Sequence, residues 1–315
     1  DEWGRLSKAL KASGVQWDAL RVEPLNDGDL RNLLAGSPKL LDAALRSRSF
    51  GPLRNLKVLD TLVGRFSNAA GVEAATVDEA SFSRWFVEDL VAGTGPSPTM
   101  RRQAATQLAI RQALTSSPET PISELELSGA IDEMIRDGIC QSDHGRIRFS
   151  HGLYGDWIRA NHLESLTTTR LAFLVDQASA PSWHRALRLY FLGMGNRSDS
   201  KSWRKAVDEL DAAGAEAIAD IALEALLFAD DEAGLISKMW PELCQEDRDL
   251  LARLLGRFLH VATLPDLRYS PVATGNPTLS VRLAARYRLP WAPLWIPVLK
   301  LLGQHADEVV RQAWV

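Results

Sequence analysis

Apolar residues recur at spacings of three and four along most of the chain, which is the pattern of amphipathic helices. The segment from Val77 to Val91 is a clear example. One face of this predicted helix carries Phe82, Trp85, Phe86 and Leu90. Alanine, leucine, arginine and glutamate, which favour helices, are abundant throughout the sequence. The pattern therefore predicts a mainly α-helical protein.

Helix-start signals divide the N-terminal part of the chain. Asn26 is typical of a residue that caps a helix, and Asp27 and Asp29 in the following turn complement the positive helix end. Pro38 is expected in the first turn of the next helix. A further helix is predicted from about Leu53 to Phe66.

A β-hairpin is predicted where the period of the pattern changes. Residues 138–142 and 146–150 alternate in polarity on either side of Asp143-His144-Gly145. Alternating runs joined by a short turn of this kind are typical of two antiparallel strands. We therefore expect one small hairpin in an otherwise helical chain.

Predicted helices flank this hairpin on both sides. Helices at about 102–114 and 127–137 precede it, and one at about 152–166 follows it directly. Residues 93–98, rich in Gly and Pro, are the best candidate for a linker and a domain boundary. The order of helices, hairpin and helix predicts a winged-helix domain over residues 97–166.

From residue 167 to residue 315 the pattern predicts only helices, with breaks that include Pro181, Gly214 and Pro241. The tryptophans in this region show no fixed period, which indicates an irregular stack of helices similar to HEAT or TPR packing. We expect these tryptophans to pack in the core: Trp183, Trp203, Trp240, Trp291 and Trp295.

Composition limits the function classes. Of 315 residues, 46% are hydrophobic and 24% charged, which is typical of a globular protein. The net charge of -4 argues against sequence-independent binding of nucleic acid. Cys140 and Cys244 are too few for a disulfide framework or a zinc site and suit a reducing, cytoplasmic compartment. The longest apolar run, Leu289 to Leu302, contains three prolines and Lys300, which argues against a membrane span.

The most informative candidate for chemistry is His151, at the junction between the second hairpin strand and the next helix. A helix N-terminus gathers free backbone N–H groups and the positive end of the helix dipole. An imidazole donor there would suit a terminal phosphate. The alternative is that His151 ends the strand and satisfies local backbone groups, and the residues alone favour this alternative.

The run Phe149-Ser-His151-Gly-Leu-Tyr-Gly-Asp156-Trp157, preceded by the hairpin, resembles the winged-helix domain of STAND signalling NTPases. These proteins are the NACHT and NB-ARC relatives of AAA+ ATPases and include bacterial antiviral members. The resemblance implies that Phe149 anchors the strand and that His151 contacts the β-phosphate of ADP and keeps the protein closed. Asp156 and Trp157 match positions often filled by an acid and an aromatic residue. The resemblance favours the nucleotide contact.

Upstream residues carry the same resemblance, which covers about residues 18–165. Residues 20–30 resemble the last strand of the nucleotide domain and the element that follows it. Residues 53–59 resemble a Leu-x-x-Pro-x-x-Leu element whose proline packs on the adenine, but Leu56 stands where that proline aligns. Pro52, four residues earlier, is the candidate substitute. The implied nucleotide-binding residues are therefore His151, Pro52 and Leu56.

The resemblance implies four regions and one function. Residues 1–24 would be the tail of a nucleotide-binding core, 25–96 a helical lid, 97–166 the winged helix, and 167–315 a helical-repeat sensor. The whole protein would be an ATP/ADP-dependent switch in signalling or antiviral defence, with a protein trigger and an oligomer on activation. The alternative is a non-enzymatic helical scaffold that mediates protein interactions.

The chain begins with Asp rather than Met and stops within a helical pattern, so we expect it to be a piece of a longer protein. It contains no phosphate-binding loop and no strand ending in paired acidic residues. We therefore expect that this chain does not hydrolyse ATP by itself and that Mg²⁺ is held by residues outside it.

Two further motifs have simpler explanations. Gly195 to Ser202 fits a phosphate-binding loop except that Ser200 replaces the second glycine. The preceding residues predict a helix rather than a strand, so we expect an inter-helix loop with Ser200 as the cap of the next helix. Residues 124–137 contain five acidic residues and one arginine, Arg136, which disfavours DNA binding through the third helix. The remaining histidines do not pair at metal-ligand spacing.

Overall fold

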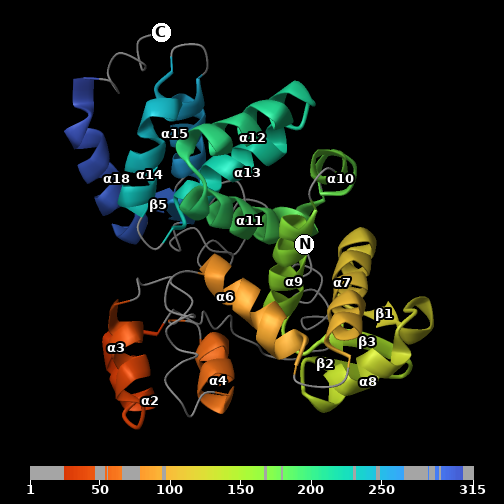
Figure 1. Cartoon of the computed structure of the whole chain (residues 1–315). Helices are drawn as coiled ribbons and strands as arrows, with labels where there is room; N and C mark the ends of the chain where they lie inside the picture. The colour runs from red at the N-terminus through yellow and green to blue at the C-terminus, as the bar shows by residue number, and fades with distance from the viewer. Residues whose placement is uncertain are drawn as a thin grey trace. The chain divides into compact units, whose positions relative to one another are not determined.

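The computed structural model describes residues 25–46, 54, 56–65, 79–93, 97–166, 169–178, 180–229, 232–245, 249–265, 283, 288–290 and 292–307. These residues belong to two compact units that divide after Arg65. The described chain is mainly helical with a small three-stranded antiparallel sheet (Figure 1). Expectations for residues 1–24 and for Pro52 lie outside the described residues. The four expected domain boundaries stay predictions.

The first unit contains helices α2 (Asp27–Leu33), α3 (Pro38–Arg46) and α4 (Leu56–Arg65). The predicted cap is confirmed: Asn26 Oδ1 accepts hydrogen bonds from the backbone N–H groups of Gly28 at 2.8 Å and Asp29 at 3.0 Å. The Asp29 carboxylate in turn accepts from the Asn26 N–H at 3.1 Å. This reciprocal pair satisfies N–H groups that a helix start leaves without partners.

The first described element of the second unit is α6 (Glu79–Trp85), which continues into a π-helical turn, η2 (Phe86–Val91). The predicted apolar face of this segment is buried, and Phe82 and Phe86 are nearly inaccessible. Both rings contact Trp157 of helix α9 (Gly152–Ser165), with centroids 4.8 and 5.0 Å away. The segment 79–91 therefore packs against the helix that follows the hairpin.

The hairpin is confirmed, and a third strand joins it. Strands β2 (Cys140–Asp143) and β3 (Arg146–Phe149) are antiparallel, with Asp143 opposite Arg146. Between them His144 and Gly145 have φ values of 47° and 75°, the geometry that matches the twist of a two-residue turn. Strand β1 (Thr120–Pro121), which the sequence did not predict, pairs with the other edge of β3.

Helices α7 (Pro98–Thr115) and α8 (Ser128–Arg136) precede the hairpin, as predicted, with a 3₁₀ turn η3 (Ile122–Glu124) between them. Helix α7 packs on α8 and on α9. The buried face of β3 carries Ile147 and Phe149 toward these helices. The sheet and the three helices therefore share one core.

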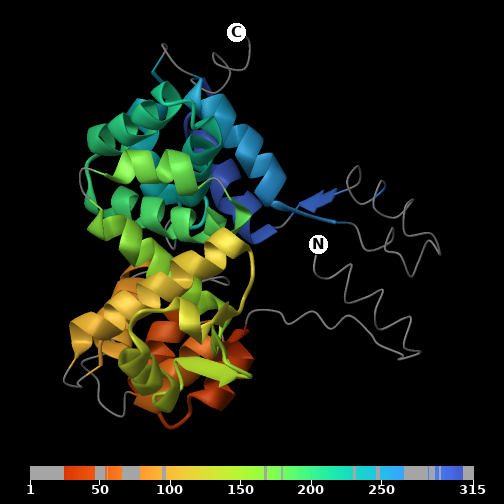
Figure 2. The same ribbon diagram turned by 90° about the vertical axis from the view of Figure 1, so that its right-hand side faces the viewer.

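Most of the remaining described residues of the second unit form a stack of helices. They are α10 (Arg170–Gln177), the 3₁₀ turn η4 (Pro181–Trp183), α11 (His184–Arg197), α12 (Ser200–Ala212), α13 (Glu216–Leu226), α14 (Glu232–Leu243), α15 (Leu250–Val261) and α18 (Ala292–Gln304). Helix α11 packs on both α9 and α13, and α13 packs on α15. In both views the sheet lies at one end of this unit and helices α11–α15 at the other (Figure 2).

The core of the stack contains three of the expected tryptophans. Trp183 and Trp203 are fully buried, and Trp240 is buried beside the ring of His305 at a centroid distance of 4.2 Å. Trp295 is partly buried and donates its indole N–H to the Ala262 carbonyl at 2.7 Å. Trp291 lies outside the described residues. The core prediction is therefore confirmed for three of these side chains.

Two predictions for this region were wrong. Pro241 does not break the chain but lies inside α14. The proline removes one backbone hydrogen bond near the helix end, while the neighbouring Trp240 and Leu243 are buried and hold the last turn in place. Ser200, the expected cap, is instead the first residue of α12. The cap is Asp199, whose carboxylate accepts a hydrogen bond from the Ser202 N–H at 2.7 Å.

The region after residue 166 is also not purely helical. Strand β4 (Thr263–Pro265) pairs antiparallel with β5 (Arg288–Pro290). The Arg288 side chain donates hydrogen bonds to the Thr263 hydroxyl at 2.6 Å and to the Thr263 carbonyl at 2.7 Å. Runs of three residues are too short to show the alternation that identifies a strand.

Candidate functional site

His151 lies where strand β3 ends, as predicted, and it is the N-cap of α9. Its backbone is extended, and its Nδ1 accepts a hydrogen bond from the Leu153 N–H at 3.2 Å. A neutral imidazole that accepts at Nδ1 carries its proton on Nε2. The side chain is therefore a local cap and also an N–H donor at a helix N-terminus.

Buried aromatic packing fixes the orientation of α9 behind His151. Phe149 on β3 and Leu153 in the first turn of α9 are buried on either side of it. The rings of Phe86, Tyr154 and Trp157 pack together, with a Phe86–Tyr154 centroid distance of 4.5 Å. Such packed rings hold the helix end in one position. His151 itself is partly exposed.

Asp156 and Trp157, the two other residues of the motif, make structural contacts. Asp156 accepts from the Arg159 guanidinium at 2.6 Å, and Arg159 also donates to the Ala109 carbonyl of α7 at 3.0 Å. Burial raises the pKa of Asp156 and outweighs the opposing effect of Arg159. The Trp157 indole N–H donates to the Glu79 carboxylate of α6 at 3.3 Å. These residues hold α9 to its neighbours.

Of the other two predicted nucleotide contacts, the structure describes only Leu56. Leu56 is the first residue of α4 in the first unit, where its side chain is 56% exposed. Pro52 is outside the described residues. Both contacts stay predictions.

The segment from Gly195 to Ser202, which resembles a phosphate-binding loop in sequence, follows a helix, as predicted. Gly195 lies within the last turns of α11, so a helix and not a strand precedes Ser200. A phosphate-binding loop must follow a strand. The motif is therefore a connection between α11 and α12.

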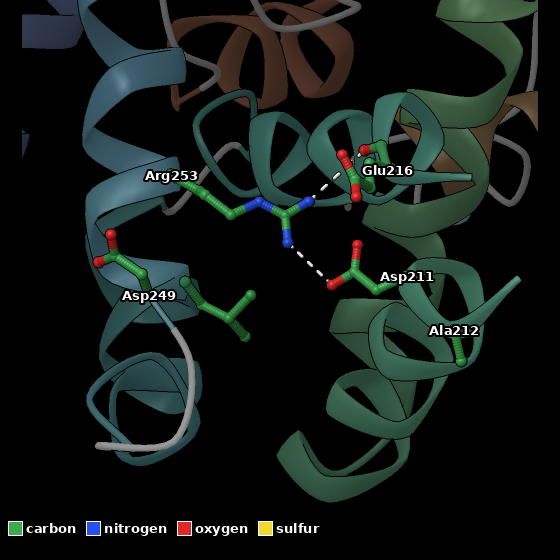
Figure 3. A pocket seen from close by; sticks show the side chains of 6 residues that line it. Asp211, Ala212, Glu216, Asp249 and Arg253 are labelled. Atoms are coloured by element: carbon green, nitrogen blue, oxygen red, sulfur yellow. Dashed lines mark hydrogen bonds and ion pairs between the residues drawn. The ribbon is translucent and has the colours of Figure 1, made fainter. Parts of the chain in front are cut away.

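A cleft that sequence reasoning missed lies between the α12–α13 turn and α15 (Figure 3). Its volume is about 490 Å³, and its lining consists of Asp211, Ala212, Glu216, Asp249, Leu250 and Arg253. The Arg253 guanidinium donates to the Asp211 carboxylate at 2.8 Å and to the Asp220 carboxylate at 2.7 Å. These charges come from three helices, so no local pattern could have indicated them.

A second cluster that the sequence did not reveal surrounds Glu224 on α13, a residue only 1% exposed. Its carboxylate contacts the His184 Nε2 at 3.1 Å and the Arg188 guanidinium at 3.3 Å, and it also accepts from Arg257. Burial alone would raise the pKa of Glu224, but hydrogen bonds from His184 and Arg257 lower that pKa to about 2. The carboxylate therefore remains ionised at neutral pH.

Among the described residues no group of His, Cys, Asp and Glu side chains could hold a metal ion. No described helix combines the length and apolar character that a membrane crossing requires. No protein-family model matches the chain, and a search of curated proteins found no significant match.

Proposed function

We propose that the chain is part of an ATP/ADP-dependent switch of the STAND class, and that residues 97–166 are its winged-helix domain. The observation that carries the proposal is the geometry of His151. Its Nδ1 caps α9, so the neutral imidazole carries its proton on Nε2, close to a helix N-terminus.

The order of elements supports the winged-helix assignment. Helix α7 is followed by β1, η3, α8, the β2–β3 hairpin and α9, and the sheet order is β1-β3-β2. A winged helix of this kind places its hairpin and its last helix side by side. His151 stands at the point where these two elements join.

In the proposed mechanism, His151 donates a hydrogen bond from Nε2 to the β-phosphate of ADP and favours the closed state. The positive end of α9 adds to this attraction. Exchange for ATP, together with a protein trigger bound by helices α10–α18, releases the closed state and permits assembly. Only a ligand with different affinities for the two states can shift the equilibrium between them.

The remaining parts of the proposal follow the sequence resemblance. Residues 1–24 would be the tail of the nucleotide-binding core and residues 25–96 a helical lid, with Pro52 or Leu56 against the adenine. Mg²⁺ and the hydrolytic groups would belong to residues outside this chain. We propose a role in cytoplasmic signalling or antiviral defence.

A second candidate function is a helical scaffold without nucleotide. One observation favours it: the hydrogen bond from the Leu153 N–H to His151 Nδ1 already gives the histidine a structural role. In a scaffold, the 97–166 region and the helical stack would serve protein contacts alone.

Two substitutions of His151 separate these functions, and they should be made in the natural polypeptide with all its domains. His151→Ala removes both the cap and the imidazole donor. His151→Asn keeps an acceptor that can cap α9, because asparagine is a preferred N-cap residue, but it removes the Nε2 donor. The measurements are ADP affinity, basal signalling or ATPase activity, and thermal unfolding.

The switch predicts that both variants bind ADP about tenfold more weakly and have raised basal activity, because each loses a hydrogen bond to a charged group. Only His151→Ala should also be less stable. The scaffold predicts that His151→Asn resembles the wild type in every assay. A protein that shows no ADP binding in any form would refute the switch.

A further inference from the structure

Strand β2 lies at one edge of the three-stranded sheet, because the strand order is β1-β3-β2 (Figure 1). In an antiparallel pair, residues whose N–H and C=O groups bond to the partner strand alternate with residues whose groups point away from it. The register of the hairpin therefore decides which backbone groups of β2 remain for a further strand.

This register is fixed at both ends of the hairpin. At the turn, Asp143 lies opposite Arg146 across two residues, and such a closing pair is hydrogen-bonded. At the other end, the Ser150 N–H donates to the Ile139 carbonyl at 2.9 Å. The positions that bond to β3 are therefore every second residue from Ile139 to Asp143. Ser142 lies between two of them, so its backbone groups point away from β3.

The opposite edge of the sheet, along β1, is closed. Just beyond β1, the Ile122 N–H donates to the Gly145 carbonyl at 2.9 Å. By the same alternation, the backbone groups of Glu119 and Pro121 face outward. Proline has no N–H to donate, and the Ser117 hydroxyl bonds to the N–H and the carbonyl of Glu119 at 3.3 and 3.0 Å. Such features keep a sheet edge from pairing with another strand.

Strand β2 lacks these protections. It contains no proline and no lysine, and its last three residues, 141–143, are exposed. In the sheet that the structure describes, β2 has a neighbouring strand on one side, which is β3. Ser142 therefore offers an N–H donor and a C=O acceptor along an open edge. An extended peptide that adds a strand to a sheet binds to groups of this kind.

Charges beside the open edge favour one kind of added strand. On the solvent face of the hairpin, Arg146 and Arg148 lie 3.3 and 3.6 Å from the Glu119 carboxylate. The Asp143 carboxylate is 83% exposed and lies 3.5 Å from His144, which is charged only when protonated. A residue opposite Asp143 on an added strand would have its Cβ about 5 Å away. A basic residue is favoured at that position and an acidic residue is disfavoured.

The same face of the sheet has room for a long basic side chain. A hollow of about 180 Å³ lies there, lined by residues of both hairpin strands and by Glu119. Lysine and arginine can lay their aliphatic stems along a protein surface while the charged end stays in water. Shape and charge at the open edge therefore favour the same kind of residue.

We propose that the outer edge of β2 binds an extended segment of a partner protein, which adds a fourth strand to the sheet and places a lysine or arginine opposite Asp143. Main-chain hydrogen bonds at Ser142 supply affinity, and the charge of Asp143 supplies selectivity. The proposal involves neither His151 nor a nucleotide, so its tests are independent of those of the proposed function.

The test uses two probe peptides and the full chain. One probe is acetyl-Thr-Val-Thr-Lys-Thr-Val-Thr-amide, and the other has glutamate in place of lysine. Binding and the hydrogen exchange of the Ser142 amide are measured by NMR. We expect the lysine peptide to slow this exchange about tenfold. It should also bind about fivefold more tightly than the glutamate peptide, as for an exposed charge pair.

Substitutions in β2 provide matched controls. Ser142→Pro removes the outward N–H but no hydrogen bond to β3, so it should weaken peptide binding about tenfold or more while Gln141 and Asp143 amides still exchange slowly. Ser142→Thr keeps the N–H and should bind like the wild type. Should the proline variant lose the hairpin, Asp143→Lys serves in its place, and it should prefer the glutamate peptide.

Three results would overturn the proposal. They are unchanged Ser142 exchange at millimolar lysine peptide, equal binding by Ser142→Pro and Ser142→Thr, and a preference for lysine that survives in Asp143→Lys. Slow Ser142 exchange that depends on protein concentration without any peptide would assign the edge to a second copy of the chain, which would also overturn it.

Discussion

Glu224→Gln should lower the free energy of unfolding at pH 7 by about 3 kcal/mol. The folded protein holds the pKa of this buried carboxyl at about 2, below its ordinary value of 4.5. Each pKa unit corresponds to about 1.4 kcal/mol, so the ionised form gains about 3 kcal/mol on folding. The cost of removing one partner from a buried ion pair, about 3–5 kcal/mol, agrees with this value.

The same shift fixes the sign of the pH dependence. A depressed carboxyl pKa gives stability that is complete above pH 4.5 and is lost as the pH falls toward 2. Between these values the unfolded chain binds a proton that the folded chain does not bind. Glu224 therefore contributes a loss of about 1.4 kcal/mol per pH unit to the wild type, and the glutamine variant lacks this contribution.

The assay is urea unfolding of both proteins between pH 3 and pH 7, with Asp220→Asn as the control. Asp220 is 34% exposed, so its loss should cost about 1 kcal/mol or less. The stabilities of the wild type and Glu224→Gln should converge as the pH falls. Two parallel curves, or equal losses for Glu224→Gln and Asp220→Asn at pH 7, would refute the reasoning.

Two further predictions concern reactivity and capping. Burial raises the pKa of the Cys140 thiol to about 12, whereas Cys244 is partly exposed. A thiol reagent at pH 8 should therefore label one cysteine in the folded protein and two in urea. Rapid labelling of both cysteines without urea would contradict the packing of β2. Because Asp199 caps α12 through the Ser202 N–H, Asp199→Ala should lower the free energy of unfolding. Ser200→Ala should cost less, and urea unfolding showing the reverse order would restore Ser200 as the cap.

Local signals in the sequence were sufficient for several elements. The Asn26 cap and the Gly145 turn depend on residues a few positions apart, and both were predicted correctly. The same holds for the position of His151, because a strand end and a helix start meet there. Such features are fixed by backbone geometry within one or two turns of the chain.

Features that depend on distant residues could not be predicted. Strand β1 has two residues and exists because Thr120 lies opposite Ile147 of β3. Likewise, Glu224 gave no signal in the sequence, since its partners His184 and Arg257 are about 40 and 33 residues away on other helices. Pro241 shows the converse, because burial of neighbouring side chains overrode a local helix-breaking preference.

The most direct test of the proposed switch compares two nucleotides on two proteins. ADP and AMP are titrated into the natural polypeptide and into its His151→Asn variant, which retains a cap for α9. A contact from His151 to the β-phosphate predicts that the substitution weakens ADP binding about tenfold, as expected for a lost hydrogen bond to a charged group, and leaves AMP binding unchanged. Equal effects on ADP and AMP, or no effect on either, would contradict the account.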